Sequence, residues 1–184
     1  MLMGNYAFID GQNLHLWLWV DWRDVDLFRL KRHLEDKYNV SKAFYYIWYY
    51  DEKNSNLYSS LEYAWFIVKF KKQRADLTSS KKWNIDTDLI FEVMRLMCKE
   101  KETFDKILLI TWDWDFKILV DFLIEEWKFE KIIFPCKQRA SSMYRKLPNM
   151  NKDYLINFKS KIEKASNIED NSWMEDLQWN IQFS

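Results

Sequence analysis

The alternation of short apolar runs with helical segments constrains the fold of this chain more than any other feature of its sequence. Apolar residues at helical spacing predict helices around residues 27–34, 57–64, 85–96 and 118–123. Between them, runs rich in aromatic and β-branched residues predict strands at Tyr6–Ile9, Val40–Tyr49, Trp65–Phe70, Ile107–Thr111 and Lys131–Phe134. Crossovers of this length join parallel strands, so we expect an α/β domain of three layers with a mostly parallel central sheet and helices on both faces.

The length of 184 residues is typical of one domain with a single core. A further short strand is predicted at Tyr154–Phe158, and residues 166–184 are polar and acidic without a repeating pattern. We therefore expect one domain over residues 1–164, followed by a tail or peripheral helix over residues 165–184.

Composition excludes several classes of protein. The 28 basic residues balance the 28 acidic ones, so the net charge predicts no partner. The first ten residues do not resemble a secretory signal, and no apolar run is long enough for a membrane span. Cys98 and Cys136 are isolated and expected to be buried thiols, which suits the cytoplasm, and His15 and His33 lie in no zinc-like cluster. The sequence leaves open whether the protein forms a homo-oligomer.

Acidic residues follow two of the predicted strands. Asp10 ends the first apolar run, while Asp113 and Asp115 come just after the fourth. Ligands of open parallel sheets bind beyond the carboxyl ends of the strands, where carboxylates held close together repel unless a cation compensates them. A single such aspartate could simply cap a helix, but three at two strand ends favour a hard divalent metal such as Mg²⁺.

Two further acids open the helix predicted from residue 85. Asp86 shares a stripe with the apolar positions Ile90 and Val93, whereas Asp88 aligns with the charged face. Asp86 is therefore the candidate site carboxylate and Asp88 its solvated neighbour. Considered alone, Asp86 is better explained as an acid that complements the helix dipole.

Residues 69–82 form the one strongly basic segment. Against a single acid, Asp76, the segment has a net excess of five positive charges. Basic side chains beside an acidic metal site suit a polyanion whose phosphate the metal would activate, although charge runs are often only a solvated loop. The candidate phosphate-binding residues are Lys71, Lys72, Arg74, Lys81 and Lys82.

Three motifs, FIDGQN, KKWNIDTDL and LLITWDWDFKILV, together resemble the NYN domain of the PIN-like nuclease superfamily over about residues 5–160. The resemblance implies that the first and fourth strands are neighbours in a parallel sheet. It also implies a metal-dependent ribonuclease that uses Mg²⁺ or Mn²⁺ and acts on RNA. The acidic metal site implied by the resemblance consists of Asp10, Asn13, Asp86, Asp113 and Asp115.

Tryptophan and glycine are both abnormal in number, with 11 and 2 residues respectively, where ordinary usage predicts about 13 glycines. Trp83 and Trp112 stand where the family pattern has glycine, and Trp114 where it has a small residue. Trp48, Trp65 and Trp127 fall at predicted strand or helix ends, which ordinarily favour glycine. One hypothesis is that most of these tryptophans are glycines encoded by UGA and mistranslated as tryptophan. The rival is that Trp112 and Trp114 are genuine and stack on bases.

The leading functional hypothesis is an endoribonuclease that hydrolyses RNA phosphodiester bonds at the acidic site. A non-catalytic RNA-binding or regulatory module is the alternative, favoured if the indoles of Trp112 and Trp114 block access of a metal. A phosphatase is a third reading, because FIDGQN superficially resembles an acidic phosphotransfer loop, but the second aspartate of such a loop is missing.

Overall fold

The central sheet contains six strands that all run parallel, in the order β3-β2-β1-β4-β5-β6. The computed structural model describes residues 3–14, 25–48, 50–70, 85–137, 140 and 142–164. The neighbouring positions of β1 and β4 and the parallel sheet confirm the expectation from the sequence. The strands are β1 (Asn5–Asp10), β2 (Val40–Ile47), β3 (Ile67–Phe70), β4 (Ile107–Ile110), β5 (Phe129–Phe134) and β6 (Lys152–Tyr154).

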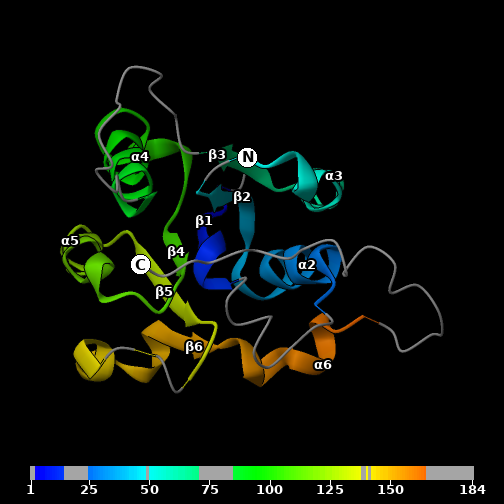
Figure 1. Ribbon diagram of the computed structural model, residues 1–184. Coiled ribbons are helices and arrows are strands. Elements are labelled where there is room, and N and C mark those ends of the chain that lie inside the picture. Colours follow the sequence, from blue (N-terminus) through cyan, green and yellow to red (C-terminus); the bar gives the residue numbers. More distant parts are fainter. Residues whose placement is uncertain are drawn as a thin grey trace, which may run out of the picture.

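Helices cover both faces of the sheet, which confirms the three-layer architecture (Figure 1). One face packs against α2 (Leu27–Tyr38), α3 (Ser55–Tyr63) and α6 (Lys159–Ile162), and the other against α4 (Ile85–Lys99) and α5 (Lys117–Glu125). Among the described residues, we find no helix whose length and apolar character would suffice to cross a bilayer. Residues 165–184 lie outside the described part of the chain, so the predicted domain boundary stays a prediction.

The central strands β1 and β4 are buried along their whole length, as a sheet covered on both faces requires. Side chains alternate between the faces, so Ala7 and Ile9 pack towards α2, whereas Tyr6 and Phe8 pack towards α4 and α5. The same alternation places Asp10, which follows Ile9, on the side of the sheet covered by α4. The carboxylate at the end of β1 therefore lies on the same face of the sheet as α4.

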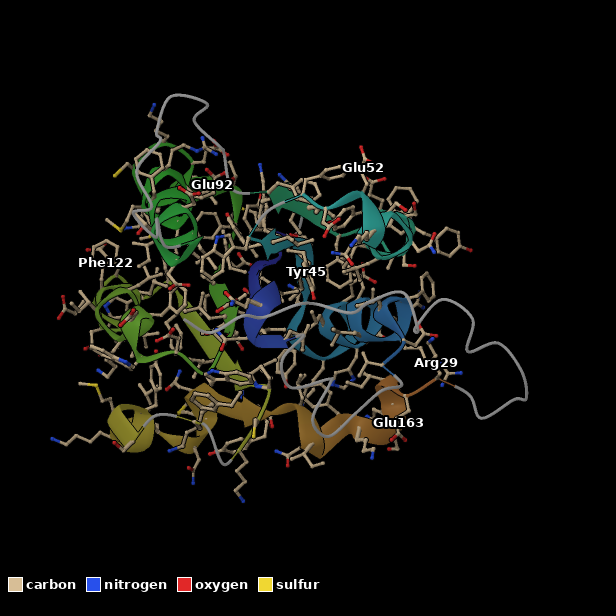
Figure 2. The ribbon with its side chains drawn as sticks, in the orientation of Figure 1. Arg29, Tyr45, Glu52, Glu92, Phe122 and Glu163 are labelled. Atoms are coloured by element: carbon tan, nitrogen blue, oxygen red, sulfur yellow. The ribbon has the colours of Figure 1, made fainter. Side chains whose placement is uncertain are left out.

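The last described residues pack back onto the start of α2. Asp26 caps this helix by accepting a hydrogen bond from the Arg29 backbone N–H at 3.0 Å. The Arg29 guanidinium donates to the carbonyl oxygen of Glu163 at 3.0 Å, and the two side chains lie near one another in Figure 2. These contacts hold α6 against α2, on the opposite side of the sheet from α4.

Three expectations from the sequence are wrong in detail. A strand was expected at Tyr154–Phe158, but the strand found here, β6, lies earlier in the chain and ends at Tyr154. The residues after it form a short 3₁₀ helix, η6 (Leu155–Phe158). Leu155 and Phe158 are both buried, and a spacing of three places them on one side of such a helix. Trp65 lies in a turn before β3 and not in the strand, and the thiol of Cys98 is exposed.

Candidate metal centre

Asp10 ends β1 and is held by the helical turn that follows it, at residues 11–14. Only 2% of its surface is exposed. The Asn13 backbone N–H donates to Asp10 Oδ1 at 3.1 Å, and the Asn13 side-chain amide donates to Asp10 Oδ2. Gly11 is required in this turn, because a Cβ at residue 11 would lie 2.3 Å from the carbonyl oxygen of Tyr46 on β2. These two hydrogen bonds therefore hold Asp10 and Asn13 together at the carboxyl end of β1.

Thr111 connects this turn with the end of β4. β1 and β4 are neighbours, and both Asp10 and Thr111 lie just beyond their last paired residues. The Thr111 hydroxyl donates to Asp10 Oδ2 at 3.3 Å and accepts from the Asn13 amide at 3.3 Å and from the Asp113 backbone N–H at 3.1 Å. Sequence reasoning gave Thr111 no role, although a polar residue directly after an apolar strand was an available signal.

The acidic turn after β4 is fixed by two further hydrogen bonds. Asp113 caps the short 3₁₀ helix η3 (Trp114–Phe116), and its Oδ1 accepts from the Asp115 backbone N–H at 3.0 Å. The Tyr144 hydroxyl, from η4 (Ser142–Lys146), donates to the Asp113 carbonyl oxygen at 2.7 Å. Sequence reasoning missed Tyr144, because nothing in a pattern of spacing links it to a residue so distant in the chain.

The third part of the site is the first turn of α4. Asp86 is buried, with 7% of its surface exposed, in agreement with its predicted place beside the apolar stripe. Asp88, two residues further on, is exposed, as predicted. α4 packs on the same face of the sheet to which β1 and β4 deliver Asp10 and Thr111. This packing brings Asp86 to the acidic turn after β4.

Asp86, Asp113 and Asp115 form one carboxylate cluster. Each offers an oxygen, and these three oxygens lie within 4.8 Å of one another. Oxygen ligands about 2.1 Å from a Mg²⁺ ion can lie up to about 4.2 Å apart, so small side-chain rotations would let all three share one ion. The cluster ranges from the buried Asp86 to the exposed Asp115, which leaves one side open to solvent. The donor set therefore fits Mg²⁺ or Mn²⁺.

Asp10 and Asn13 are placed beside this cluster and not within the group of three. Burial raises the pKa of the Asp10 carboxyl, and the negative charge of Asp113 raises it further, against the opposing effect of hydrogen bonds from Asn13 and Thr111. Asp113 thus influences Asp10 both through its charge and through the shared hydroxyl of Thr111. A cation at the cluster would stabilise the ionised form of Asp10.

The five basic candidates Lys71, Lys72, Arg74, Lys81 and Lys82 lie outside the described residues. The ends of their segment are described: it leaves the carboxyl end of β3 and enters α4 at the turn that carries Asp86. Trp83 also lies outside the described residues. Trp112 is half-buried against the apolar cores on both faces, whereas 59% of the surface of Trp114 is exposed.

Comparisons with known proteins agree with this architecture. A crystal structure of a protein of unknown function from Vibrio parahaemolyticus is similar with a TM-score of 0.64 and 18% sequence identity, over 88% of this chain and 97% of that chain. At this identity the likeness concerns the fold alone. No curated protein matches the sequence significantly. The model of the NYN domain matches residues 6–153, a range that includes Asp10, the carboxylate cluster and Tyr144. This chain therefore belongs to the NYN domain family, within the PIN-like nuclease superfamily.

Proposed function

We propose that this protein is a metal-dependent endoribonuclease that hydrolyses RNA phosphodiester bonds at the carboxylate cluster. The observation that carries the proposal is the convergence of Asp86, from α4, with Asp113 and Asp115, from the turn after β4. These side chains come from segments well separated in the sequence, and a bound cation would relieve the repulsion between their charges. Membership of a nuclease-like family gives the cluster its chemical context.

The residues of the chain have distinct tasks in this proposal. Asp86, Asp113 and Asp115 would hold Mg²⁺ or Mn²⁺ through their carboxylate oxygens. Such an ion, when bound, supplies an activated water and neutralises charge on the phosphate. Thr111 fixes the backbone of Asp113, and Asn13 keeps the carboxylate of Asp10 oriented beside the cluster. The open side at Asp115 admits the phosphodiester.

RNA is the proposed partner because of the basic segment that leads into α4. Lys71, Lys72, Arg74, Lys81 and Lys82 would contact phosphates of a strand whose scissile bond lies at the neighbouring cluster. The chain has only two cysteines, Cys98 and Cys136, which are far apart in the sequence, and such sparse use of cysteine suits a reducing compartment, so we place this activity in the cytoplasm.

Asp86→Asn and Asp88→Asn form a matched pair for testing the metal site. Both replace an acid in the first turn of α4, but only Asp86 belongs to the cluster. We expect Mn²⁺ to raise the melting temperature of the natural protein and of D88N, but not of D86N. Equal responses of the two variants to Mn²⁺ would contradict the assignment of the cluster.

Asp113→Asn separates the nuclease from the alternative, an RNA-binding module without catalysis. We expect D113N to bind single-stranded RNA but to lose Mn²⁺-stimulated cleavage. A circular RNA is the substrate of choice, because only an endonuclease can open it. If the natural protein binds RNA but leaves both linear and circular RNA intact with Mn²⁺, the non-catalytic function replaces the nuclease.

A further inference from the structure

Two tryptophans adopt the left-handed backbone conformation that glycine favours. Trp65 has a φ of 63° and Trp127 a φ of 59°. In the described part of the chain, Asn39 is the one other residue with positive φ, at 52°. Asn39 is an ordinary choice, because asparagine tolerates this conformation, but a bulky aromatic residue is not.

Each tryptophan occupies the same position in the same helix-ending motif. Trp65 is the second residue after the end of α3, and Trp127 is the second after the end of α5. In both, the tryptophan N–H and the next N–H bond back to carbonyls of the last helical turn, which defines a Schellman motif with glycine as its usual residue. The bonds are Trp65 N to Glu62 O at 2.9 Å, Phe66 N to Leu61 O at 3.0 Å, Trp127 N to Ile124 O at 3.1 Å and Lys128 N to Leu123 O at 2.8 Å.

Neither indole is buried enough to compensate for the strained backbone. The exposed fraction is 78% for Trp65 and 88% for Trp127, whereas tryptophan is normally among the most buried residues on average. The backbone of each position has a clear structural task, and the side chain gains little by burial. The backbone at these two sites therefore favours glycine, and the surroundings of the side chains give no reason for tryptophan.

The distribution of the true glycines supports the same conclusion. Gly4 and Gly11 are the two glycines of the chain, and neither has positive φ. At both, glycine is required for space, since an added Cβ would approach other atoms to 2.8 Å or less. Glycine is thus present where close packing demands it and missing from both Schellman motifs.

We infer that residues 65 and 127 are glycine in the protein that its own cell makes, with UGA codons that the cell reads as glycine. One cause then explains the left-handed tryptophans and their exposed indoles, and it accounts for part of the imbalance between 11 tryptophans and 2 glycines in the whole chain. The inference is independent of the proposed nuclease activity. Trp48, Trp112 and Trp114 do not have positive φ, so their backbone gives no such evidence.

Glycine and alanine variants at the two positions test the structural part of the inference. Trp65→Ala and Trp127→Ala remove the indole but keep a Cβ, whereas Trp65→Gly and Trp127→Gly also relieve the left-handed strain. At each position we expect glycine to raise the folding equilibrium constant roughly tenfold over alanine, which corresponds to a melting temperature about 3–6 °C higher. Glycine variants no more stable than the alanine variants would overturn the inference.

The codons and the mass of the natural protein test the remaining part. We expect UGA at both positions, and peptides of the protein from its own cell that contain glycine at residues 65 and 127. The stability comparison also needs a control for a general benefit of glycine, and Tyr63→Gly provides it. Tyr63 is also exposed, but it is the last residue of α3, where glycine should lower stability. A UGG codon or a tryptophan-containing peptide at either position would overturn the inference.

Discussion

The Tyr144 hydroxyl donates a hydrogen bond of 2.7 Å to the backbone carbonyl of Asp113, a member of the carboxylate cluster. Burial, together with the negative charge of Asp113, raises the pKa of Tyr144, so this hydroxyl remains a donor at neutral pH. The Tyr144 ring is buried against Phe134 of β5, with ring centroids 5.4 Å apart. Tyr144 is not a member of the cluster, but it holds the turn at Asp113 against strand β5.

Tyr144→Phe removes this bond and keeps the ring. We expect the variant to bind Mn²⁺ about tenfold more weakly, because groups that orient metal ligands affect metal affinity by 10-fold or more. Isothermal titration with Mn²⁺ measures the change. The matched control is Tyr154→Phe, because the Tyr154 ring also contacts Phe134, at 5.5 Å, but belongs to β6. If Y144F and Y154F bind Mn²⁺ alike, Tyr144 does not position the turn.

Thr111→Val tests the hydroxyl that joins the ends of β1 and β4. Valine has nearly the same shape but removes one of the donors to Asp10, which keeps its bonds from Asn13, and leaves the Asp113 N–H without this acceptor. We expect a loss of about 1–3 kcal/mol of stability, together with weaker Mn²⁺ binding. Thermal unfolding and Mn²⁺ titration measure the two effects. Thr111→Ser should restore both, and equal losses in T111S and T111V would show that the methyl group, not the hydroxyl, is important.

Much of the fold was predictable because buried parallel strands produce continuous apolar runs, as in β1 and β4. β6 was misplaced because Lys152 and Asp153 are polar residues of an edge strand, while the apolar signal came from Leu155 and Phe158 in the 3₁₀ helix beyond it. Periodicity detects burial. It cannot detect which backbone conformation buries a residue when the segment is this short.

The candidate site was predictable to the extent that its acids stand at the ends of strands and at the start of a helix. The sequence could not separate Asp10 from the three clustered carboxylates, because that separation depends on hydrogen bonds of the turn at Asn13 and of Thr111. Tyr144 was missed because its bond to Asp113 depends on the packing of η4 against β5. Contacts of this kind depend on tertiary structure alone.

The basic segment that enters α4 can be tested by the salt dependence of RNA binding. Replacing Lys71, Lys72, Lys81 and Lys82 by alanine should weaken binding of single-stranded RNA and reduce the slope of log K against log salt, by about 0.7 for each lost phosphate contact. Fluorescence anisotropy over a range of salt concentrations measures this slope. The control replaces the exposed residues Lys53 and Lys99, the latter at the opposite end of α4 from Asp86. A slope equal to that of the control would remove the segment from the RNA site.

Asp153 on β6 connects the edge of the sheet with α2 through a charged group. Its Oδ2 accepts from Lys37 Nζ at 2.8 Å and from the Tyr38 hydroxyl at 2.7 Å, and its Oδ1 accepts from the Asn157 amide at 2.7 Å. Burial alone would raise the pKa of Asp153, but these hydrogen bonds outweigh it and lower the pKa to about 2. The ionised carboxylate is therefore favoured in the folded state.

Because the pKa of Asp153 is lower in the folded protein than its ordinary value of 3.8, its contribution to stability is present above that value and is lost as the pH falls towards about 2. Asp153→Asn should cost about 1–2 kcal/mol near pH 7, a figure reduced for the exposure of Lys37, and the difference from the natural protein should shrink as the pH falls from about 5 to about 2. Urea unfolding at several pH values measures it. The control is Asp36→Asn, because Asp36 forms an exposed ion pair with Arg32 on α2. This variant should change stability by at most a few tenths of a kcal/mol at every pH. A difference between D153N and the natural protein that stays constant down to pH 2 would show that shape, not charge, makes Asp153 stabilising.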